Sequence, residues 1–255
     1  MIKIFHTIVI AVVFALGASI SIAENITIVA ASSIKFAMAD IVSKFNAEYR
    51  NDEVKVIYGS SGKFAAQIQN GAPFDMFFAA DVNFPQILKK ENLTSTDPVI
   101  YAVGRLVIWS STTDATKLTL QKLSESSIRK VAIANPDLAP YGMRAKEAMK
   151  SAGVWENIQG KLVFGENVEH TANMVSSGAA DAGIIPLSLA LNPAMSKQGG
   201  YSLIDNVLHG SLEQAFVITK RAKDSALARR FAAYFQTPES RKIMESYGFV
   251  LLKKH

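Results

Sequence analysis

The chain has 255 residues, with 27 basic and 22 acidic side chains, a formal net charge of +5 at pH 7 and no cysteine. This length is enough for one large domain or two small ones. Without cysteine the protein cannot contain a disulfide framework, a thiolate nucleophile or a cysteine-based metal site. The charges are scattered, and no basic stripe with interleaved aromatic residues is present, which argues against a nucleic-acid partner.

The first 23 residues have the pattern of a secretion signal. A short polar start with Lys3 and His6 precedes an apolar run over residues 8–16, and the Ser-Ile-Ala sequence at 21–23 predicts cleavage after Ala23. The apolar run is shorter than the roughly 18 residues that a membrane span needs, so a retained anchor is the less favoured alternative. Because no lipobox cysteine is present, we expect a free rather than lipid-anchored protein in a bacterial periplasm.

Beyond this leader, strand-like and helix-like patterns alternate along the chain. Apolar runs typical of strands cover residues 26–30, 54–58, 76–80, 101–109, 131–134, 162–164, 182–185, 201–204, 213–219 and 249–252. Helical spacing covers residues 34–49, 64–69, 84–90, 118–123, 141–151, 168–175, 187–191, 226–235 and 238–247. This alternation predicts an α/β fold with mostly parallel sheets flanked by helices.

Two of the extended runs are long enough to pass between two lobes. The first, residues 101–109, has Gly104 in its middle, and the second covers residues 213–219. We therefore expect one lobe made of residues 24–103 together with 221–255, and a second lobe made of residues 104–220. Closure of the lobes would then hinge near Gly104 and Lys220.

Four of the predicted strand-to-helix turns carry small or hydroxyl residues. They are Ser32-Ser33, Ser60-Ser61-Gly62, Pro140-Tyr141-Gly142 and Asn167-Val168. Unpaired N–H groups, hydroxyls and the positive end of the helix dipole make such turns suitable for anions. Ligands of open α/β sheets bind beyond the carboxyl ends of the strands, so two turns from each lobe would meet in one cleft between the lobes.

No turn contains a compelling cationic clamp, because Lys63 is expected to face solvent at a helix start. Neutral donors can nevertheless hold an oxyanion, since each hydrogen bond to a charged group contributes about 1.5–3 kcal/mol. Each serine has a plainer alternative role as a helix N-cap.

Six motifs carry a resemblance to a known family. In chain order they are Ala-Ser-Ser at 31–33, Gly-Ser-Ser-Gly at 59–62, Asn-Gly-Ala-Pro-Phe-Asp at 70–75, Tyr-Ala-Val-Gly-Arg-Leu-Val at 101–107, Asn-Pro and Ala-Pro-Tyr-Gly within 135–142, and Gly-Glu-Asn-Val at 165–168. Together they resemble the periplasmic molybdate-binding proteins of ABC importers, which have the two-lobed type II periplasmic-binding-protein fold. The resemblance covers essentially the whole chain after the leader.

The resemblance implies that a molybdate or tungstate oxyanion is held by hydroxyls and backbone N–H groups. By motif, Ser32 and Ser33 supply the first contacts, and Ser61 supplies its hydroxyl and N–H. Tyr141 and Val168 supply backbone N–H groups at their helix starts. The resemblance further implies no catalysis, no cofactor, no direct coordination of the metal by the protein, a membrane permease as partner, and a monomer.

One position departs from part of the family. One branch has a tyrosine hydroxyl contact just after the strand that corresponds to residues 182–185, and this chain has Pro186 there. Proline offers neither a hydroxyl nor an N–H group. The chain therefore fits the other branch, which has Pro-Tyr-Gly at the third turn and two adjacent donors at the first.

Alternative functions remain open at this point. Another oxyanion such as sulfate, or a ferric complex, could be the ligand, because tetrahedral dianions differ mainly in size. A secreted hydrolase with Ser61 as nucleophile would need a base nearby, and the histidines beyond the leader are His170, His209 and His255. The Gly-x-Ser-x-Gly elbow is absent, which disfavours the hydrolase.

Overall fold

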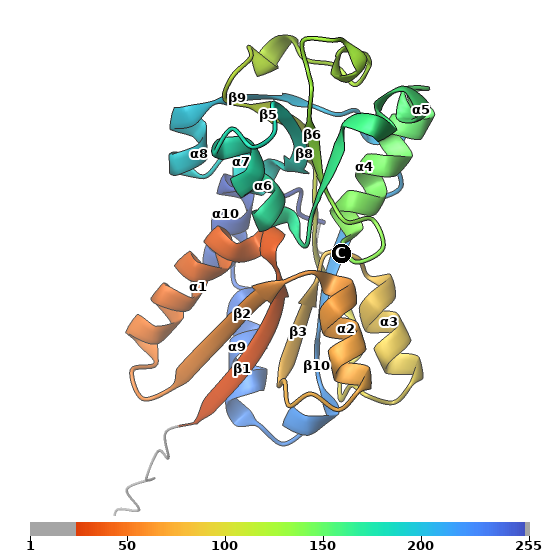
Figure 1. The fold of residues 1–255 in the computed structure, drawn as a ribbon. Helices are drawn as coiled ribbons and strands as arrows, with labels where there is room; N and C mark the ends of the chain where they lie inside the picture. The colour runs from red at the N-terminus through yellow and green to blue at the C-terminus, as the bar shows by residue number, and fades with distance from the viewer. Residues whose placement is uncertain (1–23, 253–255) are drawn as a thin grey trace, which may run out of the picture.

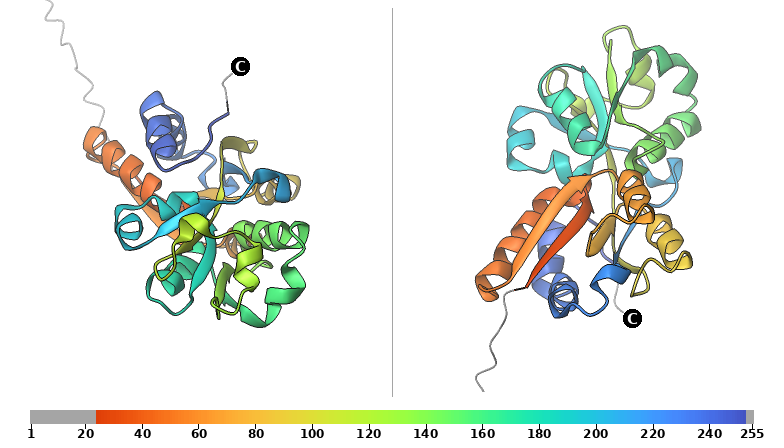
Figure 2. Two further views of the ribbon diagram at one scale, coloured as in Figure 1. Left: turned by 90° about the horizontal axis from the view of Figure 1, so that it is seen from above. Right: turned by 60° about the horizontal axis from the view of Figure 1, so that its bottom comes forward.

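A computed structural model describes residues 24–252 as two α/β lobes stacked on each other (Figure 1). The predicted leader, residues 1–23, lies outside the described residues. Within residues 24–252, no helix combines the length and the apolar character needed to cross a membrane. The tilted view on the right of Figure 2 shows the same division into two lobes, and in the view from above on the left they overlap.

The lobe drawn at the bottom of Figure 1 is built on a five-stranded sheet with the order β2-β1-β3-β10-β4. Its strands are β1 (Asn25–Ala31), β2 (Glu53–Gly59), β3 (Met76–Ala79), β4 (Val99–Val103) and β10 (Glu213–Ile218). Its helices are α1 (Lys35–Glu48), α2 (Ser61–Gln69), α3 (Asn83–Lys90), α9 (Ala226–Phe235) and α10 (Pro238–Ser246), with 3₁₀ turns η1 (Ser32–Ile34) and η6 (Lys220–Ala222). We call this the first lobe.

The second lobe repeats the arrangement with the order β7-β6-β8-β5-β9. Its strands are β5 (Leu106–Ser110), β6 (Val131–Ala134), β7 (Leu162–Gly165), β8 (Ala182–Pro186) and β9 (Gly200–Leu203). Its helices are α4 (Pro140–Ser151), α5 (Trp155–Ile158), α6 (Val168–Ser176), α7 (Leu187–Ala190) and α8 (Pro193–Gln198). Its 3₁₀ turns are η2 (Ala115–Lys117), η3 (Gln121–Ser124), η4 (Gln159–Lys161) and η5 (Asn206–Leu208).

Each sheet contains the parallel pairs that the β–α alternation predicts, and antiparallel pairs as well. β1 is parallel to β2 and β3, and β6 is parallel to β7 and β8. The strands next to the crossings run the other way: β10 is antiparallel to β3 and β4, and β5 to β8 and β9. Each sheet is therefore mixed, and its parallel half is the half followed by helices.

The two crossings between the lobes do not both lie where the sequence predicts. The first separates β4 from β5 and consists of Gly104 and Arg105, as expected. The second lies before Glu213, because β10 pairs with β3 and β4 of the first lobe. The predicted boundary at residue 220 is thus too late, and Lys220 lies in a 3₁₀ turn of the first lobe. The second extended run continues a sheet instead of spanning the gap.

Two smaller elements also differ from prediction. In place of the helix expected over residues 118–123, the structure has only the short 3₁₀ turn η3 near the end of that segment. The terminal strand expected over residues 249–252 makes only a single bridge, between Val103 and Val250. Both segments have short apolar patterns, for which periodicity alone does not separate the alternatives.

An aromatic cluster forms the core of the first lobe. The Phe78 ring lies 4.8 Å from the Phe235 ring and 4.9 Å from the Phe216 ring. Tyr101 and Phe231 complete the ring contacts of Phe78, which is fully buried on β3. This cluster joins α9, which comes late in the chain, to the sheet formed mostly by early residues.

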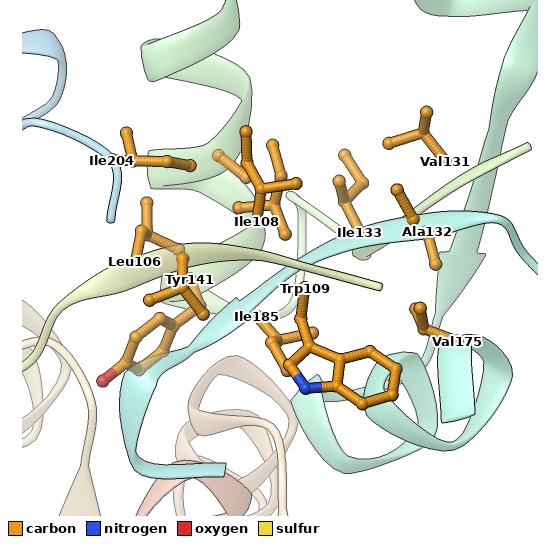
Figure 3. Close-up of a cluster of buried hydrophobic side chains, with 14 of the residues drawn as sticks. Leu106, Ile108, Trp109, Val131, Ala132, Ile133, Tyr141, Val175, Ile185 and Ile204 are labelled. Carbon is orange, nitrogen blue, oxygen red and sulfur yellow. The ribbon is translucent and has the colours of Figure 1, made fainter. Parts of the chain in front are cut away.

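The second lobe has an aliphatic core around Trp109 (Figure 3). Trp109 is fully buried on β5. Tyr141, at the start of α4, contributes to the same cluster, and its phenol oxygen points away from the other labelled side chains (Figure 3). The first turn of α4 is therefore anchored in the core of the second lobe.

We expect Phe78→Ala to lower the free energy of unfolding by about 3–5 kcal/mol, because a buried ring in contact with four others is lost. The matched control is Phe164→Ala on edge strand β7, where the ring is 51% exposed. The control should change stability by about 0.5 kcal/mol or less. Urea titrations of the three proteins measure this, and equal losses would contradict the assignment of Phe78 to the core.

Candidate functional site

Ser32 and Ser33 form the turn η1 between β1 and α1, as the sequence predicts. Each is 1% exposed, and neither hydroxyl has a hydrogen-bond partner. The residue before the turn is Ala31, which has no side chain that could cap the turn. The predicted alternative, in which the two serines are plain caps, is therefore not what the structure shows.

The turn before α2 adds two more buried serines. Ser60 is the N-cap residue of α2, but its hydroxyl makes no capping hydrogen bond and has no other partner. The Ser61 hydroxyl accepts a hydrogen bond from the Ala80 N–H at 3.0 Å. A hydroxyl that already accepts has its own proton left to donate. Ser61 is thus arranged to donate.

Gly62 allows this turn to approach the second lobe closely. Its N–H donates to the Leu138 carbonyl at 3.0 Å, which joins the lobes by a backbone hydrogen bond. A Cβ at Gly62 would lie 2.8 Å from that carbonyl oxygen, closer than real Cβ atoms come. The glycine predicted for a tight turn is therefore also required by the contact between the lobes.

Helix α4 begins in a buried place and has no side-chain cap on its first turn. Pro140 occupies the first helical position, and the preceding Ala139 cannot cap the helix. The Tyr141 N–H consequently has no intrahelical or side-chain acceptor. The next residue, Gly142, has to be a glycine, because a Cβ there would lie 2.0 Å from the Ala134 carbonyl oxygen.

Helix α6 is capped in a way that leaves one donor free. The Asn167 side chain accepts hydrogen bonds from the N–H groups of Glu169 and His170, at 2.9 and 3.0 Å. The cap does not reach the Val168 N–H, which is the first of the helix. The Val168 side chain is buried, in line with the prediction that only its N–H is available.

Contacts between the lobes bring these four turns together. η1 packs against both α6 and α7. The Ser188 hydroxyl on α7 donates to the Ser33 carbonyl at 2.6 Å, and the α2 turn meets the loop before α4 through Gly62. All the predicted site residues thus lie buried at the boundary between the lobes.

Two lysines at this boundary are paired with carboxylates of the other lobe. Lys35 pairs with Glu169, and Lys63 pairs with Glu166, each across the boundary. Lys63 is half exposed, as expected, but its contact with the second lobe was not predicted. The Glu166 pKa is lowered by the hydrogen bond from Lys63. Since these pairs are partly solvated, each contributes little to stability.

A fifth cross-boundary contact involves a more buried pair. Arg144 on α4 bonds Asp81 of the first lobe at 3.2 Å and Glu147 on its own helix at 2.7 Å. The two carboxylates thereby neutralise the positive charge of the Arg144 guanidinium. The donors offered to a ligand by the four turns are therefore neutral hydroxyls and backbone N–H groups.

Ser60 is the residue that sequence reasoning left out of the site. Its buried, unpartnered hydroxyl matches those of Ser32 and Ser33. The Ser60-Ser61 pair was a visible signal, but the sequence alone does not tell which hydroxyl of two neighbours faces inward. The structure makes both Ser60 and Ser61 candidates for binding a ligand.

Neither a catalytic serine nor a metal cluster is assembled among the described residues. The His170 Nδ1 accepts from the Glu166 N–H at 3.3 Å, and the His209 Nδ1 lies 2.7 Å from the Gly210 carbonyl oxygen, so neither ring is bonded to Ser61. Within residues 24–252, no group of three or more histidine, aspartate or glutamate side chains is placed to hold a metal ion. The chemistry available is anion binding by neutral donors.

A family model for bacterial extracellular solute-binding proteins matches residues 26–250. The chain belongs to this family. It is therefore a solute-binding protein and not an enzyme, and the hydrolase alternative is set aside.

Several known proteins resemble the chain along nearly its whole length. It is 31% identical to the molybdate-binding protein ModA of Azotobacter vinelandii over 244 residues, covering 94% of this chain and 96% of the relative. The solved periplasmic molybdate-binding protein of that organism superposes with a TM-score of 0.84 at 28% identity, covering 89% of this chain and all of the other. The sulfate-binding protein SubI of Mycobacterium tuberculosis H37Rv has a TM-score of 0.76 at 14% identity, covering 90% of this chain and 88% of the other, a likeness of fold alone.

We expect Ser32→Ala to leave the free energy of unfolding of the ligand-free protein unchanged or slightly raised, because the lost hydroxyl has no partner there. The matched control is Ser240→Ala, where a buried hydroxyl donates to the Tyr234 carbonyl at 2.8 Å. The free energy of unfolding of this control should fall by about 1–3 kcal/mol. Thermal and urea unfolding measure both, and a large loss for Ser32→Ala would mean that its hydroxyl is bonded in the ligand-free protein.

Proposed function

We propose that this solute-binding protein captures molybdate or tungstate between its two lobes and delivers the oxyanion to the membrane permease of an ABC importer. The observation that carries the proposal is the set of buried, unpartnered hydroxyls at the boundary between the lobes, where an uncapped and a partly capped helix start also lie. The ligand-binding residues we assign are Ser32, Ser33, Ser61, Tyr141 and Val168. The relatives named for molybdate support the ligand class.

The donors suit a small dianion with oxygen atoms on all sides. Ser61 has its proton free because its oxygen accepts from Ala80, and two helix N-termini add their N–H groups and partial positive charge. Each such hydrogen bond to an anion contributes about 1.5–3 kcal/mol. Exclusion of water by the closed lobes strengthens each one. The metal of the oxyanion is therefore held through its oxygens, with no protein atom coordinated to it and no cofactor.

The sequence and the family support a place outside the cytoplasm. The predicted signal over residues 1–23 would direct export, and the absence of cysteine leaves no site for a lipid anchor. We propose a free, monomeric protein in the periplasm. Closure around the ligand would then present both lobes together to the permease.

The decisive test is a calorimetric titration of the ligand-stripped mature protein with molybdate, and then with sulfate at a much higher concentration. One-to-one binding of molybdate with no sulfate heat is the expected result. Tight sulfate binding would transfer the assignment to that smaller dianion. An absence of heat with both anions would remove oxyanion binding altogether.

We expect Ser61→Ala to weaken molybdate binding by about 1–3 kcal/mol, because a buried donor to a charged ligand is lost. Ser246→Ala serves as control, since that serine is exposed at the end of α10. Calorimetry on both variants gives the comparison. A dissociation constant for Ser61→Ala equal to that of the control would exclude Ser61 from the site.

We expect Pro186→Ala to leave molybdate binding nearly intact, because proline has no N–H or hydroxyl to offer and ends β8 with its side chain buried. The same titration, together with the unfolding midpoint of the variant, measures this. A large loss of affinity in a stably folded variant would show that this position contributes to the site.

A further inference from the structure

Gln214 is a fully buried polar residue that the binding site described above does not use. It lies on β10, at a register shift between Gln214 and Ala215 in the pairing with β4. Such bulges re-aim a side chain relative to a regular strand. Here the amide is placed between two tyrosines that come from different lobes.

The two tyrosines and the amide form a directed chain of hydrogen bonds. The Tyr101 hydroxyl donates to the Gln214 Oε1 at 2.9 Å, and the Gln214 Nε2 donates to the Tyr141 hydroxyl at 2.8 Å. Tyr101 and Gln214 belong to the first lobe, and Tyr141 begins α4 in the second. This chain of hydrogen bonds therefore crosses the boundary between the lobes in a buried environment, where hydrogen bonds are strong and an unpaired polar group is costly.

Gly104, at the first crossing, provides the room for this contact. A Cβ on Gly104 would lie 2.1 Å from the Tyr141 hydroxyl oxygen and 2.7 Å from the Gln214 Nε2. The φ angle of Gly104 is not in the left-handed region, so the glycine is required by this close approach and not by its backbone conformation. The hinge and the hydrogen-bond chain thus occupy the same place.

The direction of these hydrogen bonds leaves the Tyr141 phenol proton unused. The Tyr141 oxygen accepts from Gln214, so the phenol proton is free for another acceptor. Burial raises the Tyr141 pKa, so the phenol remains a donor. The Gln214 amide and, to a smaller extent, the Ser33 hydroxyl lower that pKa, so Ser33 lies near the phenol although no hydrogen bond joins them in this structure.

We propose that Gln214 is a positioning residue for oxyanion binding: it holds the Tyr141 phenol across the lobe boundary and orients its proton toward Ser33. If Ser33 accepts from Tyr141, its own proton is the one it can offer to the ligand. The same hydrogen bond holds the first turn of α4, and with it the Tyr141 N–H, against the first lobe. This inference rests on the proposed function and deepens it, because Gln214 acts through Tyr141 and does not itself touch the ligand.

The test compares two substitutions of one side chain by molybdate calorimetry. Gln214→Met keeps the length of the side chain but neither donates nor accepts strongly, so affinity should fall about tenfold at every pH. Gln214→Glu accepts from both tyrosines when ionised, which withdraws the Tyr141 proton from Ser33. Because burial raises a carboxyl pKa, the Glu variant can regain a donor at lower pH.

We therefore expect Gln214→Glu to bind about tenfold more weakly near pH 8.5 and to recover most of the loss near pH 6, while the wild type stays constant. Glu213→Gln, on the adjacent and partly exposed residue of β10, is the matched control and should bind as the wild type does. Tyr141→Phe removes only one oxygen atom and should lose affinity about as much as Gln214→Met.

If the wild type binds molybdate and both Gln214 variants bind it as tightly as the wild type does, this inference is overturned and the proposed function is not. An affinity of Gln214→Glu that stays equally weak at pH 6 and at pH 8.5 would also overturn it, because the loss would then not depend on a hydrogen-bond donor at this position. If either Gln214 variant fails to fold, unchanged affinity in Tyr141→Phe would overturn the inference. A wild type that binds no molybdate would overturn the proposed function itself, and the inference with it.

Discussion

Burying a hydroxyl without a hydrogen-bond partner costs free energy, and among its described residues this protein does so at Ser32, Ser33 and Ser60. All three lie where the two lobes meet. A ligand that accepts hydrogen bonds would convert this cost into favourable contacts, and an oxyanion accepts from every direction. The proposed function follows from this constraint more than from any single residue, because no side chain of opposite charge is offered to the ligand by the four turns.

The rest of the fold serves to bring those donors together. In each lobe, three parallel strands direct helix starts toward one edge, and the carboxyl edges of the two sheets face each other across the boundary. The antiparallel strands β5 and β10 continue the chain from one lobe to the other. Glycines occupy three close approaches: Gly62 lies against the Leu138 backbone, Gly142 against the Ala134 backbone, and Gly104 against the side chains of Tyr141 and Gln214. Their role is steric, since each Cβ would collide with a neighbouring group.

Much of this architecture could be predicted from the sequence, since long periodic segments such as residues 34–49 and buried runs such as 131–134 define their elements locally. The four turns were located because serine and glycine follow strand patterns directly. The boundary at residue 220 could not be predicted correctly, because an extended run looks the same whether it spans two lobes or joins a sheet. Pairing of β10 with β3 is a non-local contact between residues far apart in the chain. The buried, unpartnered hydroxyl of Ser60 and the hydrogen-bond chain through Gln214 escaped prediction for the same reason, because each depends on how distant segments pack around it.

The measurement that tests the central claim most directly is anomalous diffraction at the molybdenum absorption edge from crystals of the mature protein grown with molybdate. The account predicts one strong anomalous peak at the boundary between the lobes, enclosed by η1 and the first turns of α2, α4 and α6, with only oxyanion oxygens next to the metal. A peak at any other place, or a protein atom bonded directly to molybdenum, would contradict the account.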